Sequence, residues 1–218
     1  MTETYTTEYF TTRETWRDWR IEAQQLIQLA GVKSGVRVLE VGCGSGGLLR
    51  LLVQAGAAAV GIDTSELGLQ LAHERNDCRN LARIDESGRL PFRDASFDAI
   101  VAQHLFEHVG DAQSTLTEWR RVLRPGGRIA IATPNVRYPD PSHFADDDHD
   151  HVFSPTELSD AVKQAGFNVE SCYTLFPYLT RLRALRGMGV VGHALFRRLP
   201  YFGSRGRTIM LGARKVQA

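Results

Sequence analysis

Strand-like and helix-like segments alternate along most of the chain. Short apolar, β-branched runs predict strands at 36–41, 58–63, 81–84, 96–103 and 127–134. Apolar residues at helical spacing predict helices at 14–30, 47–56, 64–75 and 114–123, the first of which ends at Gly31. Because strand and helix alternate with short connections, the pattern predicts an α/β fold with a mostly parallel sheet covered by helices on both faces.

The pattern changes in the last third of the chain. Residues 155–167 predict a helix, and 168–175 and 207–215 predict strands separated by a helical, arginine-rich segment of about 30 residues. We find no repeat, linker or low-complexity segment, so we expect a single domain over residues 1–218. Within it we distinguish an N-terminal lid region (1–31), a core (32–167) and C-terminal strands with the basic helical insertion (168–218).

Composition limits the cellular setting. The N-terminus is polar, without the basic start and apolar run of a secretory signal, and the longest uncharged stretch near the C-terminus is about half of what spans a bilayer. The three cysteines are widely spaced and form no CxxC pair, which predicts free thiols in a reducing compartment. We therefore expect a cytoplasmic protein.

Charge is distributed unevenly, although the net charge is only +1. From Phe176 onward the chain has nine Lys or Arg residues and no Asp or Glu, so a basic tail follows an acidic body. The tail is consistent with peripheral membrane contact, with a cover for a lipid-like or phosphate-bearing substrate, or with a helix whose arginines are solvated. It has no regular array of stacking aromatics, which argues against nucleic acid.

A glycine-rich turn is the strongest local signal. The stretch VLEVGCGSGGLL (38–49) runs from a strand through Gly42 and Gly44 into a helix, a geometry that lets a nucleotide-like cofactor approach the backbone closely. Asp63 follows 21 residues after Gly42, where a carboxylate can accept ribose hydroxyls. The glycine spacing also fits a dinucleotide, so it does not by itself exclude NAD. Glu40, however, would repel a pyrophosphate and suits the ammonium group of S-adenosylmethionine.

Two further stretches, LPFRDASFDAIVAQHLFEHVGD (90–111) and EWRRVLRPGGRIAIATPN (118–135), complete a recognisable set. With VLEVGCGSG and GID they resemble the class I S-adenosylmethionine-dependent methyltransferases, type 11 subgroup, over about residues 32–167. The resemblance implies a Rossmann-like, seven-stranded, mostly parallel sheet whose last strand is antiparallel. It also implies S-adenosylmethionine as cofactor and a small-molecule methyl acceptor as partner.

The resemblance assigns site residues as well. Glu40, Gly42 and Gly44 would hold the methionine end, and Asp63 with Thr64 the ribose. Asp85 or Glu86 would meet the adenine, with Asp85 favoured because it directly follows a strand, and Gln103 would lie on the methionine side. The N-terminal segment is expected to fold over the cofactor, with Tyr9 in the pocket.

The acceptor end is less defined. His104 and His108 are four residues apart, are expected to share one face of a helical turn, and are the candidates for a general base. His149 and His151 belong to an acidic, histidine-containing loop that could line the substrate pocket, chelate a cation or simply be solvated. Since the HxxxH pair has no third ligand within its motif, we predict no metal site.

The functional expectation is methylation of a small molecule, with O-methylation of a quinone precursor, a sugar or a secondary metabolite as the first interpretation. No NPPY motif follows the fourth strand, which argues against N-methylation of adenine, cytosine or glutamine. The alternatives are an NAD-dependent oxidoreductase and a non-catalytic S-adenosylmethionine-binding protein.

Overall fold

The computed structural model describes residues 6–15, 19–85, 87–138, 149–177 and 204–216. The helices are α1 (Thr7–Thr15), α2 (Trp19–Leu29), α3 (Gly47–Gln54), α4 (Glu66–Asn76), α5 (Ala112–Val122) and α6 (Pro155–Gln164), with a short 3₁₀ helix, η1 (Phe106–His108). The strands are β1 (Arg37–Val41), β2 (Ala58–Asp63), β3 (Leu81–Arg83), β4 (Phe97–Gln103), β5 (Leu123–Pro134), β6 (Phe167–Pro177) and β7 (Gly206–Lys215).

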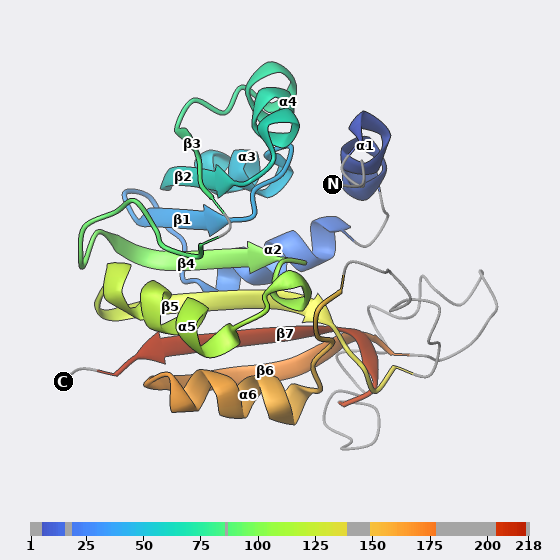
Figure 1. Cartoon of the computed structure of the whole chain (residues 1–218), viewed down its shortest axis with the longest axis vertical. Helices are drawn as coiled ribbons and strands as arrows, with labels where there is room; N and C mark the ends of the chain where they lie inside the picture. Colours follow the sequence, from blue (N-terminus) through green and yellow to red (C-terminus); the bar gives the residue numbers. More distant parts are fainter. Residues whose placement is uncertain (1–5, 16–18, 86, 139–148, 178–203, 217–218) are drawn as a thin grey trace.

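The described strands form one seven-stranded sheet in the order β3-β2-β1-β4-β5-β7-β6 (Figure 1). Strands β1 to β5 pair in parallel, whereas β7 runs antiparallel to both β5 and β6. The strand order reverses between β1 and β4. Connections from these two strands leave in opposite directions, so a ligand crevice is expected at their carboxyl ends.

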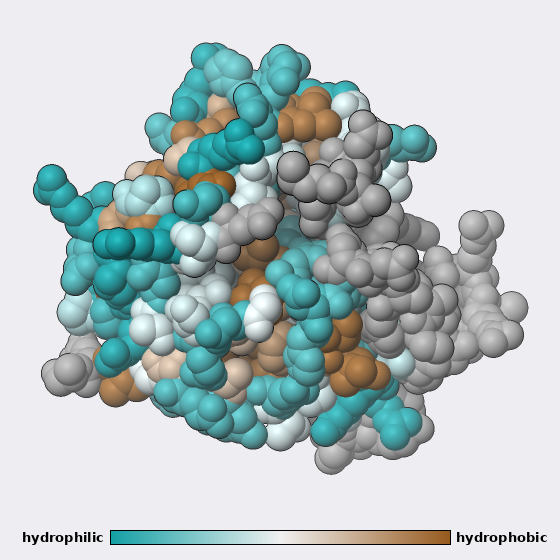
Figure 2. Space-filling model, viewed as in Figure 1, coloured by the Kyte–Doolittle hydropathy of each residue, from teal (hydrophilic) through white to brown (hydrophobic). Residues whose placement is uncertain are grey.

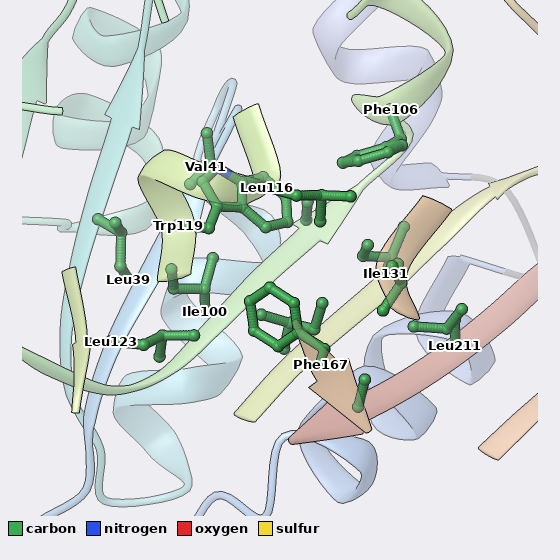
Figure 3. Packing of buried hydrophobic residues seen from close by; sticks show 14 of the residues in the cluster. Leu39, Val41, Ile100, Phe106, Leu116, Trp119, Leu123, Ile131, Phe167 and Leu211 are labelled. Carbon is green, nitrogen blue, oxygen red and sulfur yellow. The ribbon is translucent and has the colours of Figure 1, made fainter. Parts of the chain in front are cut away.

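Helices cover both faces of the sheet and create two apolar cores. Leu39 and Val41 point to the face covered by α5 and α6, where they pack with Trp119 (Figure 3). Val38, between them in the sequence, points to the opposite face and packs with side chains of α2 and α3, such as Leu26. Because both faces are buried, the central strands are almost continuously apolar.

Local signals place the helix starts where the sequence predicts them. Ser65 caps α4, its hydroxyl oxygen accepting the Gly68 amide at 3.1 Å. Ser154 and Glu157 form a reciprocal capping box at α6, with Pro155 in the first turn. The predicted fold, including the antiparallel last strand, is confirmed.

Three details differ from the prediction. The helix predicted over 14–30 is replaced by α2, which begins at Trp19, and by a separate helix, α1. The LRPGG stretch belongs to β5, where the pairing with β4 jumps from Phe97–Leu123 to Ala99–Arg128, so residues 124–127 form a bulge. The basic helical insertion falls largely on residues 178–203, outside the described residues.

Cys43, Cys78 and Cys172 are all free, as predicted, and the first two are buried. On the coloured part of the face in Figure 2, hydrophilic residues are widespread, with hydrophobic patches between them. In the part of the chain that the structure describes, no helix combines the length and apolarity needed to cross a membrane.

Candidate functional site

The glycine loop connects β1 to α3 at the carboxyl edge of the sheet. Gly42 and Gly44 have φ values of +72° and +49°, a left-handed conformation that favours glycine. A Cβ atom at Gly42 would lie 2.9 Å from Leu105 Cδ1, and one at Gly44 would lie 3.1 Å from Phe10 Cε1. The loop is therefore a tight cradle whose backbone a ligand can approach closely.

Asp63 ties this loop to the end of β2. Its Oδ2 accepts the amide hydrogen of Gly44 at 2.7 Å, and its Oδ1 accepts that of Ser65 at 2.8 Å. Burial raises the pKa of the Asp63 carboxyl, against the opposing effect of these backbone hydrogen bonds. Each oxygen keeps a further lone pair, so the fixed carboxylate can also accept hydroxyl hydrogens from a ribose.

A cavity of about 560 Å³ opens beside these two elements. Four carboxylate residues are among its described lining residues, and Lys and Arg are absent from that set; the carboxylates are Glu40, Asp63, Asp85 and Asp111. Glu40 comes from β1 and is only 2% exposed. A lining of this charge disfavours the pyrophosphate of NAD and favours a ligand with an ammonium and a sulfonium group.

Helix α1 covers the loop from above. Phe10 is 6% exposed, contacts the Gly44 turn, and would lie 3.0 Å from a Cβ at Gly68. Tyr9 lines the same cavity and packs edge-on against Phe10, with ring centroids 5.3 Å apart. The structure thus places the N-terminal aromatics at the cavity, in the position expected of a lid.

The remaining predicted cofactor residues fall around this cavity or outside the description. Thr64, Asp85 and Gln103 line it. Asp85 is exposed, and hydrogen bonds from Ser87 lower its pKa. Gln103 donates from Nε2 to Glu22 Oε2 at 3.2 Å, so it is oriented by a residue of α2. Glu86 lies outside the described residues.

His104 lies in a buried polar network. Its Nε2 is 2.9 Å from Glu22 Oε2, and its Nδ1 is 3.4 Å from Glu107 Oε1. Burial alone would lower the pKa of His104, but the charge of Glu22 and the hydrogen bonds that His104 donates to both carboxylates raise it to about 9. Likewise, burial alone would raise the pKa of Glu22, but His104, Thr208 and Arg207 lower it to about 2.

This geometry corrects the expectation that the two histidines act from one helical face. Both histidines line the cavity, but His104 has a φ of +53° and its two ring nitrogens face Glu22 and Glu107, whereas His108 sits on η1. An imidazolium with a raised pKa does not accept a proton at neutral pH, so the arrangement argues against His104 as general base. Of the two cavity-lining histidines, His108 therefore remains as the candidate base.

The two predicted loop histidines do not belong to the described cavity lining. The ring of His149 packs against that of His108, with centroids 4.9 Å apart. His151 Nε2 is 2.7 Å from Glu157 Oε1 at the start of α6, so its side chain is engaged at the helix end. Of the other acidic and histidine residues of that loop, Asp150 is described, whereas those at 143–148 lie outside the described residues.

Sequence reasoning missed Glu22 and Glu107. Both are nearly fully buried, at 2% and 1% exposure, and both hold cavity-lining side chains. A signal for Glu22 exists in hindsight, since it stands among the apolar positions of its helix, between Trp19 and Leu26. A charged residue on an apolar face requires a buried partner.

Comparisons with known proteins place the glycine loop and the strands around it in a methyltransferase family. Residues 39–131 match the model of the type 11 methyltransferase family, described as a methyltransferase domain. A demethylmenaquinone methyltransferase of Tropheryma whipplei is 40% identical over 116 residues, covering 52% of this chain and 46% of that protein. A ubiquinone biosynthesis O-methyltransferase of Bordetella avium is 29% identical over 164 residues, covering 64% and 65%. The chain thus spans about half to two thirds of these relatives.

A solved structure extends the likeness over nearly the whole chain. The phosphoethanolamine N-methyltransferase 2 of Haemonchus contortus, in complex with S-adenosyl-L-methionine, superposes with a TM-score of 0.72 at 19% identity. The match covers 97% of this chain and 58% of that one. At this identity the likeness concerns the fold. The family match over residues 39–131, together with the sheet order and the glycine cradle, identifies this part of the chain as a class I S-adenosylmethionine-dependent methyltransferase domain of the type 11 group.

Proposed function

We propose that the protein transfers a methyl group from S-adenosylmethionine to a hydroxyl oxygen of a small molecule such as a quinone precursor, a sugar or a secondary metabolite. The observation that carries the cofactor end is the cavity beside the glycine cradle, with its four carboxylates and without Lys or Arg in its described lining. Two relatives are named demethylmenaquinone methyltransferase and ubiquinone biosynthesis O-methyltransferase, and these names support a quinone-type acceptor.

In this proposal each lining residue has a defined part. Glu40, Gly42 and Gly44 hold the methionine end, with Gln103 beside them. Asp63 accepts the ribose hydroxyls next to Thr64, and Asp85 accepts from the adenine. These residues come from the ends of β1, β2, β3 and β4, which the sheet order brings to one edge.

The chemistry needs alignment and exclusion of water more than a reactive side chain. When bound, the cofactor would supply an electrophilic methyl group: the acceptor oxygen would bond to the methyl carbon, the carbon–sulfur bond would break with its electrons left on sulfur, and the hydroxyl proton would pass to His108 or to water. Phe10 and Tyr9 of α1 cover the cofactor end, which shelters that line of atoms from solvent. His108 is the histidine available at the acceptor end.

Calorimetric titration with S-adenosylhomocysteine and, in parallel, with NADH tests the cofactor assignment. We expect saturable binding of the first ligand alone. The variant Asp63→Ala should lose that binding, whereas Asp77→Ala, which changes an exposed aspartate paired with Arg79 at the surface, should keep it. Binding of NADH in place of S-adenosylhomocysteine would contradict the assignment.

Turnover separates an enzyme from a cofactor-binding protein. Labelled methyl transfer to a panel of catechol-type phenols, simple amines and sugars, read by mass spectrometry, would identify the methylated atom. Methylation of an oxygen supports the proposal. Methylation of nitrogen alone would overturn the O-methyl assignment while leaving the cofactor site intact.

A further inference from the structure

A cluster of ligand-type side chains lies at the wall of the cavity, away from the glycine cradle. Glu107, His108 and His149 each offer one ligand atom, and these three atoms lie within 4.8 Å of one another. Glu107 and His108 are on η1, directly after β4. His149 is on the segment that leads into α6, 41 residues further along the chain.

Backbone contacts hold the two segments together. The amide of His151 donates to the carbonyl oxygen of Glu107 at 3.1 Å. Two residues further along, the ring of Phe153 packs against that of Phe106, with centroids 5.7 Å apart. Since η1 and the segment at 149–153 are joined in this way, the approach of His149 to His108 is part of the fold.

Glu107 is oriented from behind by two polar groups. The hydroxyl of Thr133 donates to its Oε2 at 2.9 Å, while His104 Nδ1 lies 3.4 Å from its Oε1. His104 also lies 2.9 Å from Glu22, so its ring is shared between two carboxylates. A carboxylate buried to this extent is stabilised by a nearby cation, and such supporting hydrogen bonds are typical behind metal ligands.

We propose that Glu107, His108 and His149 bind one divalent transition-metal ion. Two imidazoles and a carboxylate are the donors that Zn²⁺ and Fe²⁺ accept, whereas Mg²⁺ and Ca²⁺ prefer oxygen alone. Donors about 2.1 Å from a tetrahedral ion are about 3.4 Å apart, so side-chain rotations that move the donor atoms by about 1 Å close the site. Because His108 lines the cavity, the open coordination positions face it.

The location gives the ion a role that rests on the proposed function. An acceptor hydroxyl bound at an open position loses its proton to water more readily, and its oxygen is held at the cavity wall. His108 then acts as a ligand and not as the base. The proposal departs from the sequence expectation of no metal site, because His149 becomes a neighbour of Glu107 and His108 only in the folded chain.

Titration of the chelator-treated full chain with Zn²⁺, followed by calorimetry, tests the proposal, and Co²⁺ provides a visible spectrum of the bound ion. We expect one equivalent to bind to the wild type. His149→Ala and His108→Ala should each weaken binding about 100-fold or more. His73→Ala is the matched control, since His73 lies on α4 with its ring at the carbonyl of Cys78, and it should bind like the wild type.

Far-UV circular dichroism and urea unfolding check that each variant is folded. His149→Gln, which keeps a polar side chain of similar size, provides a second variant with the same expected loss. Absence of Zn²⁺ and Co²⁺ binding to the wild type, or binding that survives both histidine substitutions, would overturn the proposal. Because metal binding is measured without cofactor, its failure is distinct from failure to bind S-adenosylhomocysteine or to transfer methyl.

Discussion

The buried carboxylate of Glu22 provides a quantitative test of the structure. Its oxygens accept from the Thr208 hydroxyl at 2.6 Å, from His104 at 2.9 Å and from the Gln103 amide at 3.2 Å, while the side chain is 3% exposed. Removing one partner of a buried ion pair costs about 3–5 kcal/mol, because the other charge stays buried without compensation. We expect Glu22→Ala to lower the free energy of unfolding by about 4 kcal/mol.

The conservative variant separates charge from shape. In Glu22→Gln one amide oxygen remains as an acceptor for the same donors, so we expect a loss of about 2 kcal/mol. The free energy of unfolding of a small domain is about 5–15 kcal/mol, so the alanine variant should unfold at a clearly lower urea concentration. Because the Gln103 amide loses its partner at the cavity in Glu22→Ala, affinity for S-adenosylhomocysteine should also fall in that variant.

Urea unfolding followed by circular dichroism measures these losses. Glu74→Gln is the control, since Glu74 is exposed and, among the described contacts, its Oε1 accepts only from Gln70 on the preceding turn, at 2.9 Å. That change should stay within about 0.5 kcal/mol. A loss below about 1 kcal/mol in Glu22→Ala would refute the reasoning, because it would mean that the network is not a buried ion pair.

Three further predictions concern the cofactor end. Gly42→Ala places a Cβ 2.9 Å from Leu105 at a φ of +72°, so we expect S-adenosylhomocysteine affinity to fall at least about 10-fold by calorimetry. Gly35→Ala, at a φ of +82° with no atom within 4 Å, should cost stability without affecting affinity. Affinity for S-adenosylhomocysteine should also fall as the pH is lowered from about 8 to about 5, because burial raises the pKa of Asp63 and protonation of its carboxylate removes an acceptor for the ribose hydroxyls. Asp63→Asn should flatten this pH dependence. Phe10→Ala opens the cover over the loop, and we expect about 10-fold weaker binding in the same titration; unchanged affinity would remove α1 from the site.

What the sequence could predict is local. The strand–glycine–helix turn depends on residues within a few positions of one another, and the structure confirms it. The cap at Ser65 and the capping box at Ser154 are local in the same sense. The cavity location follows as well, because alternating strands and helices determine which strand ends meet. The position of α1 and the bulge in β5 depend instead on packing against distant segments, which periodicity does not contain.

The buried network shows why the acceptor end could not be read in the same way. Glu22 and His104 are 82 positions apart, and Thr208 is a further 104 positions along the chain. In sequence, His104 and His108 look like a pair at helical spacing. In the fold, the positive φ of His104 sends one ring toward Glu22 and leaves the other beside His149. The four-residue spacing suggests a shared role, but in the fold the two histidines have different roles. His104 contacts Glu22 of α2 and Glu107, and His108 faces the cavity where the acceptor is expected.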